Sequence, residues 1–286
     1  MAFDLAAAAR QEMIERGFEP DVPADALRQA SELKPATAAG LEDLTGLLWS
    51  SIDNDESRDL DQIEWAERVA DGIRVLVGIA DVDALVERRT PIDAHAEHET
   101  TTVYAGVRTF PMLPERLSTD LTSLNEGGKR PAIVIEMVVR ADGGIGSSRV
   151  FAALVQNRAQ LTYSTVGPWL EDAAHMPAKV GATPGLEEQL RLQNEAAHLL
   201  REARHRLGAL TFDRQEMQAV VEDGQVKGIK ARQANRASRL IEDFMIGANE
   251  VMARTLRAGG VTAIRRVAST SRSVSCLSRS TDHPGR

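Results

Sequence analysis

A dense run of acidic residues constrains this chain more than any other feature of its sequence. Six of the twelve residues from 53 to 64 carry a carboxylate, and like charges repel one another when a fold brings them together. The apolar run 47–52 comes directly before them and predicts a buried strand. The fold must therefore leave these side chains in water or place a cation among them.

Three of these acids, Asp53, Asp59 and Asp61, follow a D-x5-D-x-D spacing. Mg²⁺ prefers oxygen ligands and usually keeps several waters, so two or three carboxylates and a substrate phosphate suit it. One or two such ions can activate water and stabilise the leaving oxygen of a phosphodiester. The spacing is thus compatible with a magnesium site, and a solvated acidic loop is the alternative.

A calcium loop of the EF-hand type is a second alternative. Its ligand positions 1, 3, 5, 7, 9 and 12 would be Asp53, Asp55, Ser57, Asp59, Asp61 and Glu64. The position that requires glycine is Arg58, however, and the flanking segments have the pattern of strands rather than of two helices. These two departures disfavour a calcium loop.

Strand patterns and helix patterns interleave along the rest of the chain. The predicted strands are 47–52, 73–79, 132–140 and 150–161, with hairpin turns at 142–144 and 222–225. The predicted helices are 3–17, 25–33, 186–207 and 235–258. Because no regular βαβ period is present, we expect an α+β fold with a mixed or antiparallel sheet flanked by helices.

The chain divides into three parts by composition. Residues 1–46 predict a small N-terminal helical region that packs on the rest of the chain, and residues 47–267 hold the sheet-forming patterns. Residues 268–286 contain six serines between 269 and 280 and no apolar period. Such a segment buries too little surface to offset its ordering entropy, so it is expected to be a disordered or non-native tail.

Charge and cysteine content narrow the class of protein. The net charge of −8 excludes a protein that coats nucleic acid non-specifically, although a local RNA channel remains compatible with it. No apolar run approaches the roughly 20 residues that span a bilayer. The one cysteine, Cys276, cannot form an internal disulfide, and the N-terminus lacks a signal-peptide pattern. We therefore expect a cytoplasmic protein without membrane contact.

The acidic run belongs to a longer series of motifs. The segment Ser51-Ile-Asp-Asn-Asp-Glu-Ser-Arg-Asp-Leu-Asp-Gln62, followed by Val77-Gly-Ile-Ala-Asp-Val82, resembles the signature of the ribonuclease II (RNB) family. Further similar segments occur in family order at 100–104, 110–118, 123–125, 159–163, 208–212 and 240–249. The resemblance spans roughly 47–267 and is far more specific than the acidic spacing alone.

The resemblance implies a processive 3′-to-5′ exoribonuclease that hydrolyses single-stranded RNA to nucleoside 5′-monophosphates with Mg²⁺. By position, Asp53, Asp59 and Asp61 match the family's catalytic and metal-binding aspartates. The family usually has a fourth aspartate where this sequence has Gln62. The carbonyl oxygen of Gln62 can still ligate Mg²⁺, but it brings no negative charge.

Four further residues are assigned to RNA binding by the resemblance. Tyr104 and Phe212 match the aromatic residues that clamp the stacked bases, and Tyr163 matches a tyrosine near the scissile nucleotide. Glu242 matches a glutamate on the long helix that contacts the substrate. Stacking on aromatic rings tolerates any base, which suits a degradative nuclease. Core packing for the aromatics and an exposed helix position for Glu242 are the alternatives.

The resemblance ends near Val267, whereas the family's catalytic domain continues and supplies an arginine near the cleaved bond. We therefore expect an incomplete RNB-type domain. Two other functions stay open: a non-catalytic RNA- or protein-binding remnant, and a structural module that binds a divalent cation. His95 and His98 do not have zinc-protease spacing and are expected to be solvated on a polar helix.

Overall fold

The centre of the molecule is a six-stranded sheet. In the computed structural model, residues 4–209, 216–222, 225–232 and 234–264 are described. The strands lie in the order β1 (Glu42–Asp43), β8 (Ile145–Thr162), β2 (Trp49–Asp53), β3 (Gln62–Val69), β4 (Gly72–Ala80) and β7 (Lys129–Val139). Most neighbouring strands are antiparallel, but β8 runs parallel to β1 and β2. The expected α+β class with a mixed sheet is confirmed.

The long strand β8 closes this sheet on itself. Its residues 145–156 pair antiparallel with β7, and its residues 157–162 pair parallel with β2. Since β2 and β8 run in the same direction, Asp53 at the end of β2 lies beside Thr162 at the end of β8. The acidic segment therefore starts next to Tyr163, although 110 positions separate the two in sequence.

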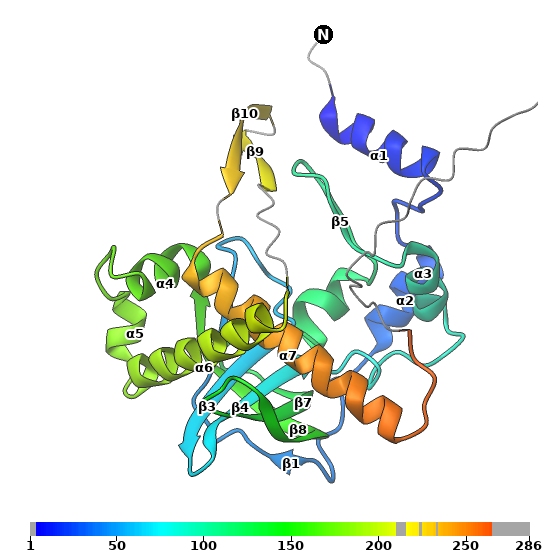
Figure 1. The fold of residues 1–286 in the computed structure, drawn as a ribbon. Coiled ribbons are helices and arrows are strands. Elements are labelled where there is room, and N and C mark those ends of the chain that lie inside the picture. Colours follow the sequence, from blue (N-terminus) through cyan, green and yellow to red (C-terminus); the bar gives the residue numbers. More distant parts are fainter. Residues whose placement is uncertain (1–3, 210–215, 223–224, 233, 265–286) are drawn as a thin grey trace, which may run out of the picture.

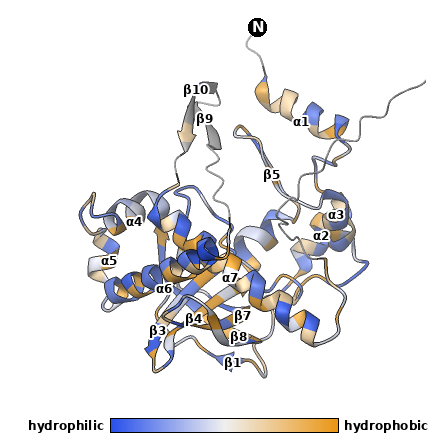
Figure 2. Cartoon of the chain, in the orientation of Figure 1, coloured by the Kyte–Doolittle hydropathy of each residue, from blue (hydrophilic) through white to orange (hydrophobic). Residues whose placement is uncertain are grey.

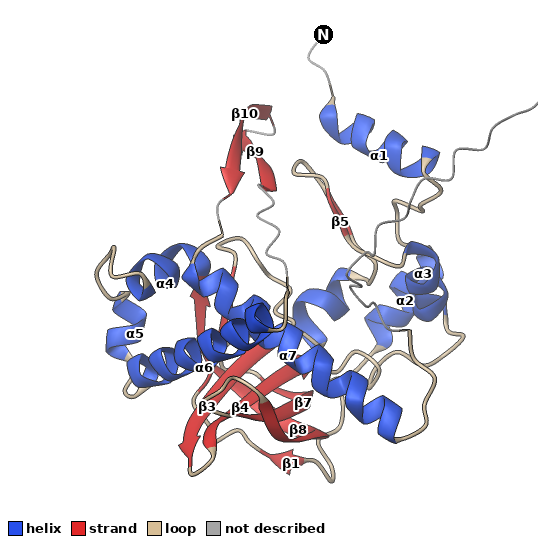
Figure 3. Cartoon of the chain, in the orientation of Figure 1, coloured by secondary structure: helices blue, strands red, loops and turns tan. Residues whose placement is uncertain are grey.

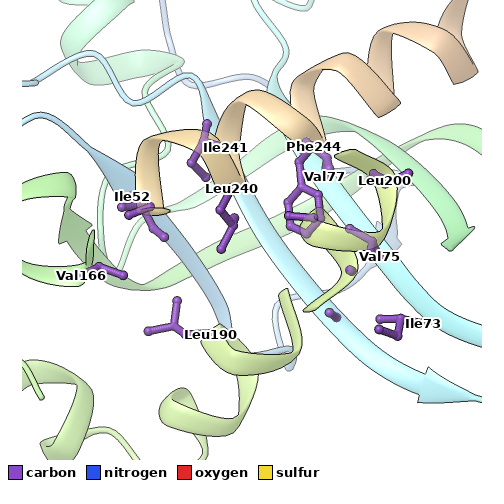
Figure 4. Packing of buried hydrophobic residues seen from close by; sticks show 14 of the residues in the cluster. Ile52, Ile73, Val75, Val77, Val166, Leu190, Leu200, Leu240, Ile241 and Phe244 are labelled. Atoms are coloured by element: carbon purple, nitrogen blue, oxygen red, sulfur yellow. The ribbon is translucent and has the colours of Figure 1, made fainter. Parts of the chain in front are cut away.

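Two long helices, α6 (Leu186–Arg206) and α7 (Arg236–Ala258), cover one face of the sheet (Figures 1 and 3). The main core lies between them and the strands, where Leu240 and Phe244 of α7 pack with Ile52 and Val77 (Figure 4). Complete burial of each such side chain contributes about 1.5–3 kcal/mol. Figure 2 shows α6 as largely hydrophilic on the side turned toward the viewer, as expected for a helix with one buried stripe.

Two charged contacts and one glycine fix these helices in place. Asp243 of α7 is buried and pairs with Arg201, at 2.8 Å, and with Arg204, both on α6. In the turn between β7 and β8, Gly143 has φ +76° and lies against the backbone of α6, where a side chain would collide with the Leu199 carbonyl. These contacts join α6 to α7 and bring the turn between β7 and β8 against α6.

A smaller region lies beside the sheet and contains the helices α1 (Leu5–Glu15), α2 (Ala24–Glu32) and α3 (Pro91–Glu99) and the π-helix η1 (Arg116–Leu121). Ala26 and Ala30 of α2 pack with Ile92 of α3 and Leu117 of η1. Residues 24–32 therefore lie against later parts of the chain. The short helices α4 (Tyr163–Leu170) and α5 (Ala178–Ala182) connect β8 to α6.

Two hairpins complete the described fold. One joins β5 (Val103–Tyr104) to β6 (Thr109–Phe110), and the other joins β9 (Glu216–Glu222) to β10 (Gln225–Arg232). Among the described helices, none is long and apolar enough to cross a bilayer.

Two sequence expectations differ from the structure, one about the strand that follows the acidic run and one about a histidine on α3. The sequence pattern predicts 73–79 as the first strand after the acidic run, but the strand β3, which begins at Gln62, comes before it. The expectation that His95 is solvated is wrong: its side chain is buried, because it lies one turn after Ile92 on the face of α3 that packs inward. His98 is exposed, as expected, and its Nε2 lies 3.0 Å from the Gly17 carbonyl oxygen.

Candidate active site

The acidic segment is a loop between β2 and β3 that one buried side chain anchors. Leu60 is buried in the core cluster on the sheet face opposite α6 and α7. Its backbone N–H donates to Ser123 Oγ at 2.9 Å, and the Ser123 hydroxyl donates in turn to the Arg58 carbonyl at 3.2 Å. Asp59 and Asp61 therefore flank a residue that is anchored in the core.

The three predicted aspartates form one electrostatic cluster. Partial burial, together with the smaller effects of the Asp59 and Asp53 charges, raises the pKa of Asp61 to about 6. Among the described residues, no lysine or arginine pairs with any of the three. Within the described parts of the chain, the cluster therefore carries a negative charge that no basic side chain neutralises.

Tyr104 belongs to this cluster as well. Its hydroxyl donates a 2.6 Å hydrogen bond to Asp59 Oδ2, while 66% of its surface stays exposed. Burial of the hydroxyl, this hydrogen bond and the three aspartate charges all raise the Tyr104 pKa. The hairpin of β5 and β6 thus places the Tyr104 hydroxyl against Asp59 and leaves most of the side chain exposed.

A second polar contact to the acidic loop comes from the edge of the sheet where β2 and β8 end. Ser164, in the first turn of α4, donates a 2.6 Å hydrogen bond to Asp55 Oδ1. Tyr163 packs against the main core, and its carbonyl accepts a 2.8 Å hydrogen bond from Asn235 Nδ2 at the start of α7. Tyr163 is therefore close to the end of β2 in the fold and is held by α7.

The remaining predicted site residues have less support. Glu242 is exposed on α7, and among the described residues no hydrogen bond or ion pair joins it to the aspartates. Phe212 lies outside the described residues. Gln62 is half-buried as the first residue of β3 and pairs with Ile79. The strands on both sides of the loop also argue against an EF-hand, which needs two helices there.

The donor set of this loop fits a hard divalent cation. Asp53, Asp59, Asp61 and Gln62 offer only oxygen ligands, and the uncompensated charge of the aspartates favours a cation. In the part of the chain that the structure describes, no three His, Cys, Asp or Glu side chains are already close enough to hold an ion. Direct coordination by all three aspartates would therefore require the loop to close around the metal.

Glu64 is a further acid close to this loop, and the sequence pattern pointed to it only as the last position of the disfavoured calcium loop. It is fully buried on β3, and burial and the charge of Asp53 raise its pKa well above the usual range. The available signal was a single charged residue inside the otherwise buried stretch Ile63-Glu64-Trp65-Ala66. That signal is easily missed beside five neighbouring acids.

The family assignment follows from comparison with known proteins. The model of the RNB domain matches residues 41–279, so the chain belongs to the RNB domain family. Exoribonuclease 2 of Salmonella typhi is 35% identical over 223 residues, which cover 76% of this chain and 34% of the relative. The chain thus spans about a third of the length of the curated relatives that it matches.

Solved structures agree with this assignment. RNase R of Mycoplasma genitalium, in complex with ribose-methylated single-stranded RNA, superimposes with a TM-score of 0.83 at 26% identity. The match covers 90% of this chain and 40% of that protein. Yeast Ssd1, described as a pseudonuclease, has a TM-score of 0.61 at 14% identity, over 79% of this chain and 28% of Ssd1, which supports the fold alone.

Proposed function

We propose that this chain is the catalytic part of a 3′-to-5′ exoribonuclease that hydrolyses single-stranded RNA to nucleoside 5′-monophosphates with Mg²⁺. The single observation that carries the proposal is the electrostatic cluster of Asp53, Asp59 and Asp61, which no described basic residue neutralises. The 35% identity to an exoribonuclease and the RNA-bound relative of the same fold support it.

The aspartates, with the Gln62 carbonyl at the edge of the cluster, would hold the metal. When bound, Mg²⁺ supplies charge stabilisation for the leaving oxygen and an activated water. The side chain of Tyr104, most of which is exposed, would stack on a base at the RNA 3′ end while its hydroxyl contacts Asp59. Tyr163, Phe212 and Glu242 are proposed as further substrate contacts on the basis of the family resemblance.

The test is degradation of a 5′-labelled single-stranded RNA in Mg²⁺ and in EDTA. We expect stepwise shortening from the 3′ end in Mg²⁺ only, and loss of at least a hundredfold in rate for Asp61→Asn. Asp71→Asn is the matched control, because Asp71 is exposed in the turn between β3 and β4, at the far end of β3. If the unchanged chain does not shorten the RNA in Mg²⁺, the proposed exoribonuclease activity is refuted.

A second function, RNA binding without cleavage, is favoured by Gln62. An amide at this position lowers the negative charge of the cluster by one relative to a carboxylate and so weakens the attraction for a cation. Retention of the same RNA without shortening, in both Mg²⁺ and EDTA, would support this second function.

The domain organisation and the cellular location are also proposals. We infer that 47–267 is the catalytic unit, that 1–46 is an accessory helical region and that 268–286 is a tail. The packing of α2 against α3 and η1 supports the second of these. A cytoplasmic location is proposed from the single cysteine.

A further inference from the structure

The hairpin of β5 and β6, which carries Tyr104, is too short to hold its own direction. It projects away from the six-stranded sheet (Figure 1), and two residue pairs join its strands, with Tyr104 paired to Thr109 at the end toward the turn. A two-stranded hairpin alone is at best marginally stable in water, so contacts with the rest of the chain must orient it. Phe110, which is buried, anchors its base.

Arg108 anchors the turn of the hairpin. Its guanidinium pairs with Asp21 at 2.8 Å, and its Cζ lies 4.9 Å from the centroid of the Phe110 ring. Asp21 is in the connection between α1 and α2, and it also pairs with Arg10 of α1. One carboxylate therefore joins the N-terminal helix to the turn of the hairpin, 87 positions away in sequence.

The connection that contains Asp21 is attached to the rest of the fold. The backbone N–H of Glu19 donates to Glu99 Oε1 at 2.6 Å, and Glu99 is buried at the end of α3. The helix α2, which follows this connection, packs with α3 and η1. The turn of the hairpin is therefore attached, through Arg108 and Asp21, to a segment that is bound to α3.

The ion pair between Arg108 and Asp21 is on the surface, where such pairs contribute little to overall stability. A small interaction still shifts the populations of a short hairpin whose orientations differ little in free energy. One contact depends on this orientation, because the Tyr104 hydroxyl donates to Asp59 Oδ2 at 2.6 Å. The ion pair is thus placed to control where Tyr104 lies.

We propose that Asp21 and Arg108 are positioning residues that hold the hairpin against the aspartate loop, and that they increase the affinity for RNA by keeping Tyr104 there. They act through Tyr104 and do not contact RNA themselves. The N-terminal helical region thereby acts on the site through one carboxylate. The effect on RNA rests on the proposed function, whereas the positioning of Tyr104 does not.

Replacement of Asp21 separates positioning from a simple effect of charge, because the two predict opposite signs. RNA is a polyanion, so loss of a nearby acid raises its affinity for the protein when the acid acts by charge alone. The same replacement also releases Arg108 to bind a phosphate. A loss of affinity on removal of this acid would therefore come from the loss of position.

The first measurement is fluorine NMR of the chain labelled with fluorotyrosine, without RNA or metal. The chain has two tyrosines, so the spectrum has two signals, and Tyr104→Phe assigns them. Tyr163, which packs against the main core, is the internal reference. Spectra are compared for the unchanged chain, Asp21→Ala, Asp21→Glu and Glu32→Ala. Glu32 is exposed on α2 and controls for the loss of one acid.

We expect Asp21→Ala to move the Tyr104 signal toward that of a solvent-exposed tyrosine and to leave the Tyr163 signal in place. Asp21→Glu keeps the negative charge, so its Tyr104 signal should return most of the way to that of the unchanged chain. Glu32→Ala should change neither signal. A general loss of stability would instead affect both tyrosines.

The second measurement is the affinity for a labelled single-stranded oligonucleotide in EDTA, where cleavage does not interfere. We expect Asp21→Ala to bind about threefold to fivefold more weakly, as a partial loss of the stacking on Tyr104. Glu32→Ala should bind as well as the unchanged chain or slightly better. In the Tyr104→Ala background, Asp21→Ala should cause no further loss, because no ring is left to position.

Three results would overturn the proposal. If the unchanged chain binds RNA but Asp21→Ala binds it equally well or more tightly, or leaves the Tyr104 signal unchanged, Asp21 does not position Tyr104 and the proposed function stands. Equal losses with and without the Tyr104 ring would assign the effect to a direct contact. If the unchanged chain binds no RNA, the proposed function fails, and the effect of Asp21 and Arg108 on RNA affinity fails with it.

Discussion

The Tyr104 hydroxyl lies 2.6 Å from Asp59 Oδ2, although 45 residues separate them in sequence. The contact joins a residue predicted to stack on a base to a residue predicted to bind metal. The hydrogen bond uses the hydroxyl at the end of the ring, and Tyr104 is 66% exposed. One side chain can therefore contact RNA and orient Asp59 at the same time.

Separate variants should divide these two roles of Tyr104. Tyr104→Phe keeps the ring, so we expect its affinity for single-stranded RNA in EDTA to stay within twofold of the unchanged chain. Tyr104→Ala removes the ring and should lose about 1–3 kcal/mol of binding free energy. Fluorescence anisotropy with a labelled oligonucleotide measures both, and Thr109→Ala on the same hairpin is the control. Equal losses for Phe and Ala would assign the contribution to the hydroxyl.

The raised pKa of Asp61 predicts a dependence of stability on pH. Its folded pKa of about 6 is above the ordinary value of 3.8, so the folded state holds more protons between these pH values. The contribution of Asp61 to the free energy of unfolding is therefore most favourable below about pH 4 and declines as the pH rises to about 6. Since Asp61 is only partly buried, water screens part of the effect, and we expect a change of about 1 kcal/mol.

Urea unfolding in EDTA at pH 4 and pH 7 checks this sign. Asp61→Asn cannot titrate, so its stability relative to the unchanged chain should increase by that amount between the two pH values. A difference between the two proteins that stays constant, or that changes in the opposite direction, would contradict the electrostatic coupling of the aspartates.

The buried ion pairs of Asp243 predict a large loss of stability on neutralisation. Asp243→Asn leaves Arg201 and Arg204 without their counter-charge between α6 and α7, which should lower the free energy of unfolding by about 3 kcal/mol. Glu242→Gln is the matched stability control, because Glu242 is the exposed neighbour on the same helix. Chemical unfolding measures both, and similar values for the two variants would show that the ion pairs contribute little.

Asn235 should have two separable roles at the start of α7. Its side chain accepts a hydrogen bond from the Ser238 N–H at 3.0 Å and donates another to the Tyr163 carbonyl at 2.8 Å. Asn235→Ala loses both and should destabilise the chain by about 1–2 kcal/mol. Asn235→Asp keeps the helix cap but cannot donate to Tyr163, so its loss should be smaller. An aspartate variant as unstable as the alanine variant would mean that the bond to Tyr163 dominates.

Patterns of local sequence predicted much of the fold. The strands at 73–79 and 132–140 and the helices at 186–207 and 235–258 correspond to β4, β7, α6 and α7 within a few residues. Each of these segments has a strong period or a clear terminal signal, such as Asn235 as the helix cap and Gly259 after the helix. The strand β3 was missed because its residues are buried on both faces and begin inside the acidic run, which hides the alternation.

Local sequence was enough to identify the chemical groups that are available: a spaced set of aspartates after an apolar strand, and the order of the family motifs. Which of these groups meet depends on the folded arrangement, because contacts between distant residues follow from strand pairing and not from local pattern. The parallel pairing of β2 with β8 places Asp53 beside Tyr163, and the hairpin of β5 and β6 places Tyr104 on Asp59. The burial of Glu64 depends in the same way on tertiary contacts. The helix α6 packs on β3 there, and the Glu64 side chain is excluded from water.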